Sequence, residues 1–267
     1  MTRIASVQMV STPRLEQNLQ TAAQLTQQAC QAGAELVVLP EFFCLMGHSD
    51  QDKLTIAETE GQGPIQLFLQ QLAQQHGIYL IAGSIPIRSN VPNKVFNTCL
   101  VYNPNGQQIQ RYDKVHLFSF KGIYEQYDEG KTLQTGQPQI KTVQCGAIQV
   151  GLSICYDLRF PEFFRAMVPV DLFVVPSAFT YTTGKAHWEL LLRARAVENQ
   201  CYVLGSNQGG LHENGRQTWG HSMIVDPWGE VLVCLEKGQG FVVESVDAKR
   251  LQMIRERLPA LKHRVFK

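Results

Sequence analysis

One internal duplication constrains the fold of this chain more than any other feature of its sequence. The segment ELVVLPEFF at 35–43 has a counterpart in DLFVVPSAF at 171–179, each with an acidic residue, an apolar run and then proline. Each segment is followed by a helical stretch and a second apolar strand, which ends at Ser84 in the first half and at Asn207 in the second. The repeated order of strand, helix and strand predicts that one βα unit occurs twice.

The repeat extends to the turns and to the opening strand. LVYNPNGQ at 100–107 matches MIVDPWGE at 223–230, with Asn or Asp, Pro and Gly at equivalent positions, so both predict hairpin turns. The opening RIASVQM also resembles QVGLSIC at 149–155. The unit is therefore expected to cover roughly the first 110 residues and again the stretch from about Ile140 to Val246.

These halves predict a layered fold. Near-continuous apolar strands imply sheets covered by helices, and two equivalent halves imply two sheets that face one another. We therefore expect an α/β fold, a four-layer αββα sandwich with an internal pseudo-two-fold duplication, formed by residues 1–267 as a single domain. An ordinary doubly wound sheet is the alternative. The glycines around Gly209 do not match G-x-G-x-x-G, so they do not indicate a dinucleotide site.

Composition narrows the classes of partner. Lys and Arg total 24 against 23 for Asp and Glu, a net charge of +1, so no general field attracts nucleic acid or anionic lipid. The short apolar stretch at the N-terminus resembles neither a secretory signal nor a membrane span, and we expect the protein in the cytoplasm. The seven cysteines include no C-x-x-C pair, which argues against a disulfide framework and a structural zinc site. Most are expected to be buried free thiols.

Cys155 occupies the position of a nucleophile. It stands in GLSICYDLRFPE, after an apolar strand and before a helical stretch. On such a turn a side chain can project from the sheet, while the backbone N–H groups that follow it face an incoming oxyanion. Because free cysteine is among the most buried residue types, an inert core thiol is the alternative.

Glu41 and Lys114 are the candidate partners of this thiol. Glu41 follows Pro40 at the end of an apolar strand, where partial desolvation would raise its pKa towards that of a general base. Ordinary pKa values of about 8.5 for Cys and about 4.3 for Glu oppose the proton transfer by roughly 6 kcal/mol. Lys114, in RYDKVHLF, can favour the thiolate and later the oxyanion, although a solvated loop lysine is its alternative.

Four motifs carry a resemblance to a known family. PEFF at Pro40, RYDKVHLF at Arg111, GLSICYDLRFPE at Gly151 and AHWELLLRARAVENQCYV at Ala186 resemble the carbon-nitrogen hydrolase (nitrilase) superfamily across nearly the whole chain. Within it, the chain resembles the Nit subgroup of amidases. The tract NQGGLHENGRQTWGHSMIVDPWGE is closer to deaminated glutathione amidases than to ω-amidases. The resemblance implies an αββα sandwich, a homodimer, and chemistry that needs no metal or organic cofactor.

The resemblance also implies a Glu-Lys-Cys catalytic set, which falls on Glu41, Lys114 and Cys155. It further implies a second glutamate after the lysine, which the segment YDEGKTLQTG places at Glu129, with Glu125 as a competing candidate. Glu129 would hold Lys114 or orient the amide of the substrate by hydrogen bonding.

The reaction that follows is acyl transfer to water through a thioester. Glu41 accepts the proton of Cys155, and the oxyanion is held by Lys114 and the backbone N–H of Tyr156. The expected function is hydrolysis of a primary amide of a small carboxylate-bearing substrate with release of ammonia, and deaminated glutathione is the best candidate. An ω-amidase acting on α-ketoglutaramate, another amidase, a carbamoylase or nitrilase, and a non-catalytic interaction protein are the alternatives.

Substrate recognition is expected close to the cysteine. Arg159, in YDLRF, is the nearest donor for a substrate carboxylate, and Arg193 and Arg195 are weaker candidates. His221 is expected to line the pocket or pack in the core rather than to act as a base. The other residues expected to bind or border the substrate are Tyr156, Phe179, Thr182, Thr183 and His187.

Overall fold

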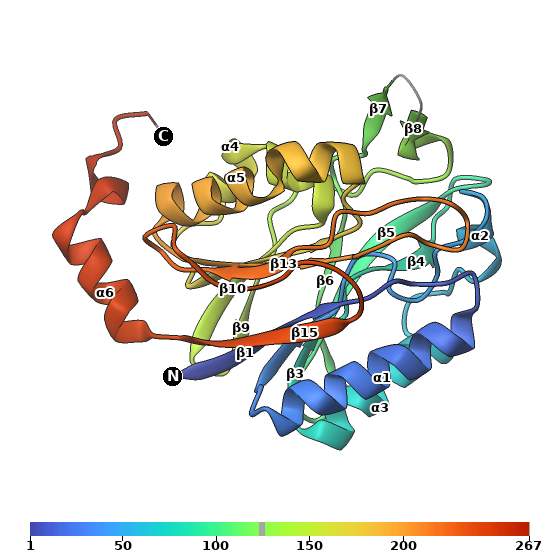
Figure 1. The fold of residues 1–267 in the computed structure, drawn as a ribbon, viewed down its shortest axis with the longest axis horizontal. Coiled ribbons are helices and arrows are strands. Elements are labelled where there is room, and N and C mark those ends of the chain that lie inside the picture. The colour runs from blue at the N-terminus through green and yellow to red at the C-terminus, as the bar shows by residue number, and fades with distance from the viewer. Residues whose placement is uncertain (123–125, 267) are drawn as a thin grey trace.

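Two β-sheets pack face to face between two layers of helices in the computed structural model, which describes residues 1–122 and 126–266 (Figure 1). Helices α1 and α3 cover the first sheet, and α4 and α5 cover the second (Figure 1). This arrangement confirms the four-layer αββα sandwich and excludes a single doubly wound sheet. The helices of the outer layers are α1 (Leu15–Gln31), α3 (Pro64–His76), α4 (Pro161–Ala166) and α5 (Tyr181–Asn199).

The first sheet has seven strands in the order β15-β1-β2-β3-β5-β4, with β6 also paired to β5. Strands β1, β2 and β3 run parallel, and the remaining pairs are antiparallel. Its strands are β1 (Thr2–Gln8), β2 (Leu36–Val38), β3 (Tyr79–Ile81), β4 (Ile85–Arg88), β5 (Val95–Tyr102), β6 (Gln108–Asp113) and β15 (Gly240–Val246).

The second sheet has six strands in the order β14-β13-β12-β11-β10-β9. They are β9 (Thr142–Cys145), β10 (Ile148–Leu152), β11 (Leu172–Ser177), β12 (Tyr202–Asn207), β13 (Ser222–Val225) and β14 (Val231–Leu235). The remaining elements are α2 (Asp52–Thr55), α6 (Ala248–Arg257), the hairpin of β7 (Ser119–Lys121) and β8 (Gln126–Asp128), and the short helices η1 (Glu129–Lys131), η2 (Cys155–Arg159) and η3 (Ala260–His263).

The duplication is visible in the topology. Parallel strands β1, β2 and β3 correspond to parallel strands β10, β11 and β12, and each set continues into a hairpin, β5–β6 or β13–β14. Both predicted turns close with a backbone hydrogen bond of 2.9 Å, from Asn103 N to Gln107 O and from Asp226 N to Glu230 O. One strand departs from the expected division, because β15 of the second half pairs with β1 in the first sheet.

The two sheets are joined by apolar packing and by hydroxyl groups. Ser6 Oγ donates to the carbonyl of Gly205 across the sheets at 2.9 Å. Trp188 of α5 is fully buried and packs on β12, where Gly205 leaves space for its ring. Strands β1 and β12 lie opposite each other across the two packed sheets. Residues that follow the parallel strands of both halves therefore meet at one edge of the sandwich.

The cysteines follow the expectation drawn from their number. All seven lie in the described part of the chain as free thiols, and five of them are buried, with Cys30 half-buried and Cys234 exposed. Among the described residues, no helix combines the length and the apolar character that crossing a membrane requires.

Candidate active site

Cys155 stands at the sharp turn between strand β10 and the short helix η2. Its φ angle is 48°, a left-handed backbone conformation that is uncommon for a residue other than glycine. A constrained turn between a strand and a helix presents a nucleophile at the edge of a sheet in other hydrolases. Only 8% of the residue is exposed, so bulk water has little access to the thiol.

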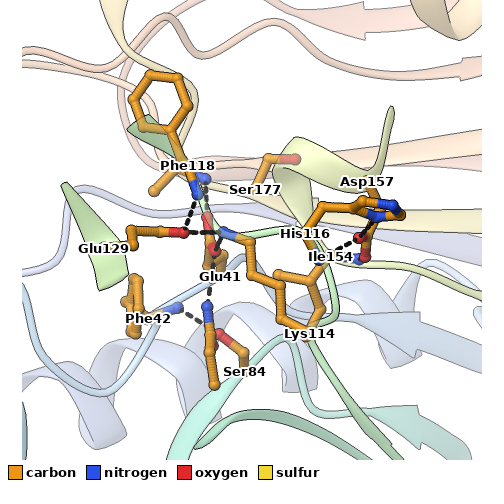
Figure 2. A network of polar contacts seen from close by, with 12 residues as sticks. Glu41, Phe42, Ser84, Lys114, His116, Phe118, Glu129, Ile154, Asp157 and Ser177 are labelled. Carbon is orange, nitrogen blue, oxygen red and sulfur yellow. Dashed lines mark hydrogen bonds and ion pairs between the residues drawn. The ribbon is translucent and has the colours of Figure 1, made fainter. Parts of the chain in front are cut away.

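The carboxylate of Asp157 holds this turn in place. Its Oδ2 accepts hydrogen bonds from the backbone N–H of Ile154 at 2.8 Å and from the hydroxyl of Tyr112 at 2.6 Å. Its Oδ1 lies 2.7 Å from Nδ1 of His116 (Figure 2). Because Tyr112 belongs to β6, the buried network connects the turn that carries Cys155 to the first sheet.

Glu41 follows strand β2 and is fully buried. Its Oε1 accepts hydrogen bonds from Asn97 Nδ2 at 2.8 Å and from Lys114 Nζ at 2.9 Å. Its Oε2 accepts one from the backbone N–H of Ala178, the residue after β11, at 2.9 Å. The carboxylate is therefore held by donors from both halves of the chain.

The backbone around Glu41 is fixed as well. Its carbonyl oxygen accepts a hydrogen bond from Gln208 Nε2 at 3.1 Å. The next residue, Phe42, has a φ angle of 53° and donates its N–H to Ser84 Oγ at 3.1 Å (Figure 2). These contacts set the direction of the carboxylate before any substrate arrives.

Lys114 lies between two carboxylates. Its Nζ is 2.9 Å from Glu41 Oε1 and 2.9 Å from Glu129 Oε2, and the lysine side chain is 0% exposed (Figure 2). Glu129, at the start of η1, also accepts the backbone N–H of Phe118 at 2.7 Å. A buried cation with two anionic partners is fixed in position and keeps its charge. Glu125, the competing candidate, lies outside the described residues.

The charge state of Glu41 differs from the expectation. Burial by itself would raise the pKa of Glu41, but the Lys114 charge and hydrogen bonds from Lys114, Cys155 and Asn97 outweigh burial. The net effect lowers the pKa of Glu41 below its ordinary value of 4.5. The expected rise in this pKa is therefore wrong, because a carboxylate that pairs with a buried ammonium is stabilised in its charged form.

Cys155 and Lys114 both hold their protons more tightly than usual. Burial and the nearby charge of Glu41 raise the pKa of the Cys155 thiol well above its ordinary value, against the opposing effect of Lys114. Burial would lower the pKa of Lys114, but Glu129 and Glu41 raise it beyond its ordinary value. The resting site therefore contains a neutral thiol beside two carboxylates and one ammonium.

A narrow pocket opens onto these groups. Four of the residues expected to border the substrate line it, and two do not. Thr182 is exposed on the first turn of α5, since the neighbouring Thr183 faces inward and bonds Thr180. His187 is exposed and lies 3.3 Å from a guanidinium nitrogen of Arg159 instead. The pocket is lined by Glu41, Phe118, Glu129, Cys155, Tyr156, Arg159, Ala178, Phe179, Thr180, Thr183 and Arg216.

The other candidates, Arg193, Arg195 and His221, make structural contacts outside the pocket. Arg195 is buried and donates to the carbonyl of Leu158 at 2.7 Å, and Arg193 forms an exposed ion pair with Glu189. His221 stacks on Trp219 with ring centroids 4.2 Å apart. Their side chains have structural partners and do not line the pocket.

Several residues of the site were not anticipated. Asn97 occupies a buried position in the apolar strand β5. A polar residue within an apolar run could have indicated a buried hydrogen bond at this position. Arg216 lies in the tract after β12, where it is one basic residue among polar and glycine neighbours. The contacts of Phe118 and Ala178 with the carboxylates use backbone N–H groups, which no side-chain pattern reveals.

The family model described as "Carbon-nitrogen hydrolase" matches residues 3–256. The chain belongs to the carbon-nitrogen hydrolase family. It is a hydrolase of carbon-nitrogen bonds, as its motifs indicated. In the described residues, no group of three or more His, Cys, Asp or Glu side chains is arranged to hold a metal ion.

Individual relatives support the same assignment. The chain is 41% identical to a deaminated glutathione amidase of Synechocystis sp. over 98% of its own length and 97% of that protein. Saccharomyces cerevisiae Nit3, a member of branch 10 of the nitrilase superfamily, has the same fold with a TM-score of 0.89 and 31% identity, covering 99% of this chain and 97% of Nit3. The C. elegans NitFhit protein matches with a TM-score of 0.90 and 35% identity over 99% of this chain, which spans 65% of the NitFhit chain.

Proposed function

We propose that the protein is a cysteine amidase that hydrolyses deaminated glutathione. The observation that carries this proposal is that Glu41 and Cys155, which are far apart in the chain, line one narrow pocket, while the buried ammonium of Lys114 lies 2.9 Å from Glu41 Oε1. The Synechocystis relative, whose name states this substrate, supports the choice of amide.

The first half of the reaction forms a thioester. Glu41 takes the proton of Cys155 as Sγ attacks the carbonyl carbon of the amide, so that a carbon-sulfur bond forms. The carbonyl oxygen becomes an oxyanion beside the Lys114 ammonium and the backbone N–H of Tyr156, in the first turn of η2. Glu41 then passes its proton to the amide nitrogen, the carbon-nitrogen bond breaks, and the amine leaves.

The second half returns the enzyme to its starting state. Glu41 takes a proton from a water molecule, whose oxygen attacks the thioester carbon. A second oxyanion forms at the same donors, the carbon-sulfur bond breaks, and the thiol of Cys155 recovers the proton. Glu129 keeps Lys114 in place through both halves, because both of its oxygens lie within 3.0 Å of Nζ.

The resting pKa values define when the nucleophile forms. A raised pKa for Cys155 and a lowered pKa for Glu41 oppose proton transfer in the empty site. This favours attack coupled to proton transfer, since the oxyanion forms as the thiol loses its proton and gives Lys114 a further anionic partner. The ion pair is thus arranged for the transition state rather than for a stored thiolate.

The identity of the leaving group follows from the substrate. Deaminated glutathione contains two secondary amides, so hydrolysis of the γ-linked amide next to the deaminated residue releases the dipeptide cysteinylglycine, and the release of ammonia expected from the sequence does not apply to this substrate. Ammonia leaves only when a primary amide such as α-ketoglutaramate is hydrolysed. Arg159 lines the pocket, with its guanidinium 5.8 Å from the ring of Tyr156 and 5.5 Å from that of Phe179. A role for this guanidinium in binding the carboxylate of the acyl part belongs to the proposal.

Steady-state kinetics on two substrates test this function. Purified protein is given deaminated glutathione or α-ketoglutaramate, and cysteinylglycine, ammonia and α-ketoglutarate are quantified. We expect a kcat/KM at least tenfold higher for deaminated glutathione, and no turnover of either by Cys155→Ala. Higher activity on α-ketoglutaramate would make the protein an ω-amidase. Normal turnover by Cys155→Ala would contradict the thioester mechanism itself.

Assembly and location remain parts of the proposal. We propose that residues 1–267 act as one domain, that two copies form a homodimer, and that the enzyme works in the cytoplasm. The exposed apolar side chains Leu190 and Val197 on α5 and Trp228 near it support pairing through this face. Light scattering of the purified chain should give twice the mass of 30.0 kDa.

A further inference from the structure

A second pocket lies next to the pocket of Cys155, and the two share Arg216. The inner pocket has a volume of about 10 Å³, which is room for about one water molecule. The neighbouring pocket, here called the outer pocket, has a volume of about 380 Å³. A substrate can place its reacting carbonyl group in the inner pocket, but most of its remaining atoms need other space. The outer pocket is lined by Phe42, Leu45, Met46, Gly47, His48, Ser49, Asp50, Lys53, Gln126, Tyr127, Asn214, Gly215 and Arg216.

Arg216 stands between the two pockets with an incompletely used guanidinium group. Its Nη2 donates to the carbonyl of Ala178 at 3.4 Å, and its guanidinium lies 4.9 Å from the ring centroid of Tyr127. Its Nε is buried and has no hydrogen-bond partner among the described residues. No carboxylate in the described ranges 1–122 and 126–266 pairs with it within 4.0 Å. A buried N–H without an acceptor is costly, and a bound carboxylate would supply one.

Lys53 places a second cation in the outer pocket. Its side chain is only 12% exposed, and its Nζ bonds Thr132 Oγ1 at 3.2 Å and lies 5.3 Å from the Phe42 ring. It forms a long ion pair of 3.5 Å with Asp50, whose side chain is 60% exposed. Burial lowers the pKa of Lys53, and the charge of Arg216 lowers it further, against Asp50 and Glu129. The positive charges of Arg216 and Lys53 repel one another, so an anion bound between them would stabilise the charged forms of both side chains.

The position of Glu41 indicates which part of the substrate enters the outer pocket. In the proposed reaction Glu41 protonates the leaving nitrogen, so the amine must lie on the Glu41 side of the reacting carbon. The next residue, Phe42, lines the outer pocket, whereas Tyr156, Arg159 and Phe179 border the inner pocket alone. The leaving amine therefore points towards the outer pocket, and the acyl part points away from it.

We propose that the outer pocket binds the leaving half of the substrate, and that Arg216 and Lys53 bind a carboxylate at its far end. The inference rests on the proposed amidase function and specifies its substrate class, namely amides whose amine portion is a short, carboxylate-terminated chain such as a dipeptide. The planar guanidinium suits a two-point contact with a carboxylate, and the Lys53 ammonium adds a point charge. The leaving part of a primary amide is only ammonia, so a primary amide would not occupy the outer pocket.

Kinetics on a matched pair of substrates test this inference. Wild type, Arg216→Gln and Lys53→Gln are assayed with deaminated glutathione and with its C-terminal methyl ester, which lacks the terminal charge. We expect Arg216→Gln to raise KM for the free acid by about 10- to 100-fold, with kcat within about threefold of wild type. The ester should lose less than threefold in kcat/KM, and Lys53→Gln should give a smaller effect of the same kind.

The control variant is Arg88→Gln, which removes an exposed arginine at the end of β4. It should change neither substrate's kinetics, and melting temperatures exclude a folding defect in the other variants. Equal losses on the acid and the ester in Arg216→Gln would overturn the inference, because the residue would then bind another group. So would wild-type activity that does not distinguish the two substrates.

Direct binding separates this inference from the proposed function. If wild type hydrolyses neither compound, the function has failed, and calorimetry with alanylglycine, a dipeptide with the same terminal carboxylate as the leaving amine, decides the inference. Binding to wild type that weakens at least tenfold in Arg216→Gln, and is absent with the dipeptide methyl ester, would support a carboxylate site. Absence of binding to wild type, or equal binding of dipeptide and ester, would refute it.

Discussion

The ammonium nitrogen of Lys114 lies 2.9 Å from a carboxylate oxygen of Glu41, and the two side chains are 0% and 2% exposed. A pair this deeply buried gains little net stability relative to apolar residues, since both charges were taken out of water. The ion pair contributes to catalysis by positioning, because it holds the ammonium at the place where the oxyanion develops. The same pair keeps the Glu41 carboxylate ionised in the resting site.

Replacing Lys114 by methionine should therefore affect both stability and rate. The variant leaves Glu41 and Glu129 close together without their shared cation, which should cost about 3–5 kcal/mol of unfolding free energy. Loss of the oxyanion donor should lower kcat by about 100-fold or more. Urea denaturation and steady-state kinetics measure the two effects.

A double variant distinguishes the two effects of Lys114. Lys114→Met combined with Glu129→Gln removes one of the unpaired carboxylates, so it should recover part of the lost stability and none of the lost activity. If the double variant were no more stable than the single one, repulsion between the carboxylates would not explain the destabilisation.

Glu129 should act on the rate through Lys114. In Glu129→Gln the amide oxygen can still accept the N–H of Phe118, but the ammonium loses one of its two anionic partners. We expect kcat to fall by about 10- to 100-fold with KM within threefold, because the loss concerns positioning in the transition state. Glu162→Gln, an exposed change at the start of α4, is the matched control and should behave as wild type. A loss confined to KM would place Glu129 in substrate binding instead.

The fold was largely predictable from the sequence because the same strand and turn patterns occur in both halves of the chain. The apolar runs 36–39 and 172–175 and the two turns that contain Pro and Gly are local patterns, and each half supports the interpretation of the other. The placement of β15 was not predictable, because pairing with β1 is a contact between the two ends of the chain. Local periodicity states that a strand forms, but not which sheet it joins.

The site was predictable where side chains carry the chemistry. Glu41, Lys114, Glu129 and Cys155 lie in recognisable motifs, and the structure brings all four together. The charge state of Glu41 was not predictable, because burial and a cation shift its pKa in opposite directions and only geometry decides between them. Thr182 and Thr183 were both expected at the pocket, but one residue on a helix corresponds to about 100° of rotation, so Thr182 faces away while Thr183 lines the pocket.

The lowered pKa of Glu41 also predicts a dependence of stability on pH. A carboxyl whose pKa is lower in the folded state contributes stability above its unfolded value of 4.5, and this contribution is lost as the pH falls through the folded value. Thermal unfolding of wild type should therefore become easier below about pH 4.5, and the fall should be shallower in Glu41→Gln. The raised pKa of Lys114 acts at the other end, since its contribution is complete below pH 10.5 and is lost only at higher pH. Parallel profiles for wild type and Glu41→Gln would show that Glu41 does not titrate in this range.

Asp157 offers a test of how the nucleophile is positioned. Tyr112→Phe removes one of the donors to its carboxylate while keeping the buried ring, which is 1% exposed. A buried carboxylate that loses a donor should cost about 1–3 kcal/mol of unfolding free energy. Because the same carboxylate holds the N–H of Ile154, the turn at Cys155 should loosen, and kcat should fall while KM stays within twofold.

A second tyrosine provides the control for this variant. Tyr79 lies at the start of β3, and its hydroxyl has no hydrogen-bond partner in the part of the chain that the structure describes. Tyr79→Phe should change stability by less than about 0.5 kcal/mol and leave kcat unchanged. If both variants lost the same stability, the hydroxyl of Tyr112 would contribute nothing specific to Asp157. If Tyr112→Phe lost stability alone, with full kcat, the geometry at Cys155 would not depend on the network, and its backbone conformation would have to be maintained by β10 and η2 themselves.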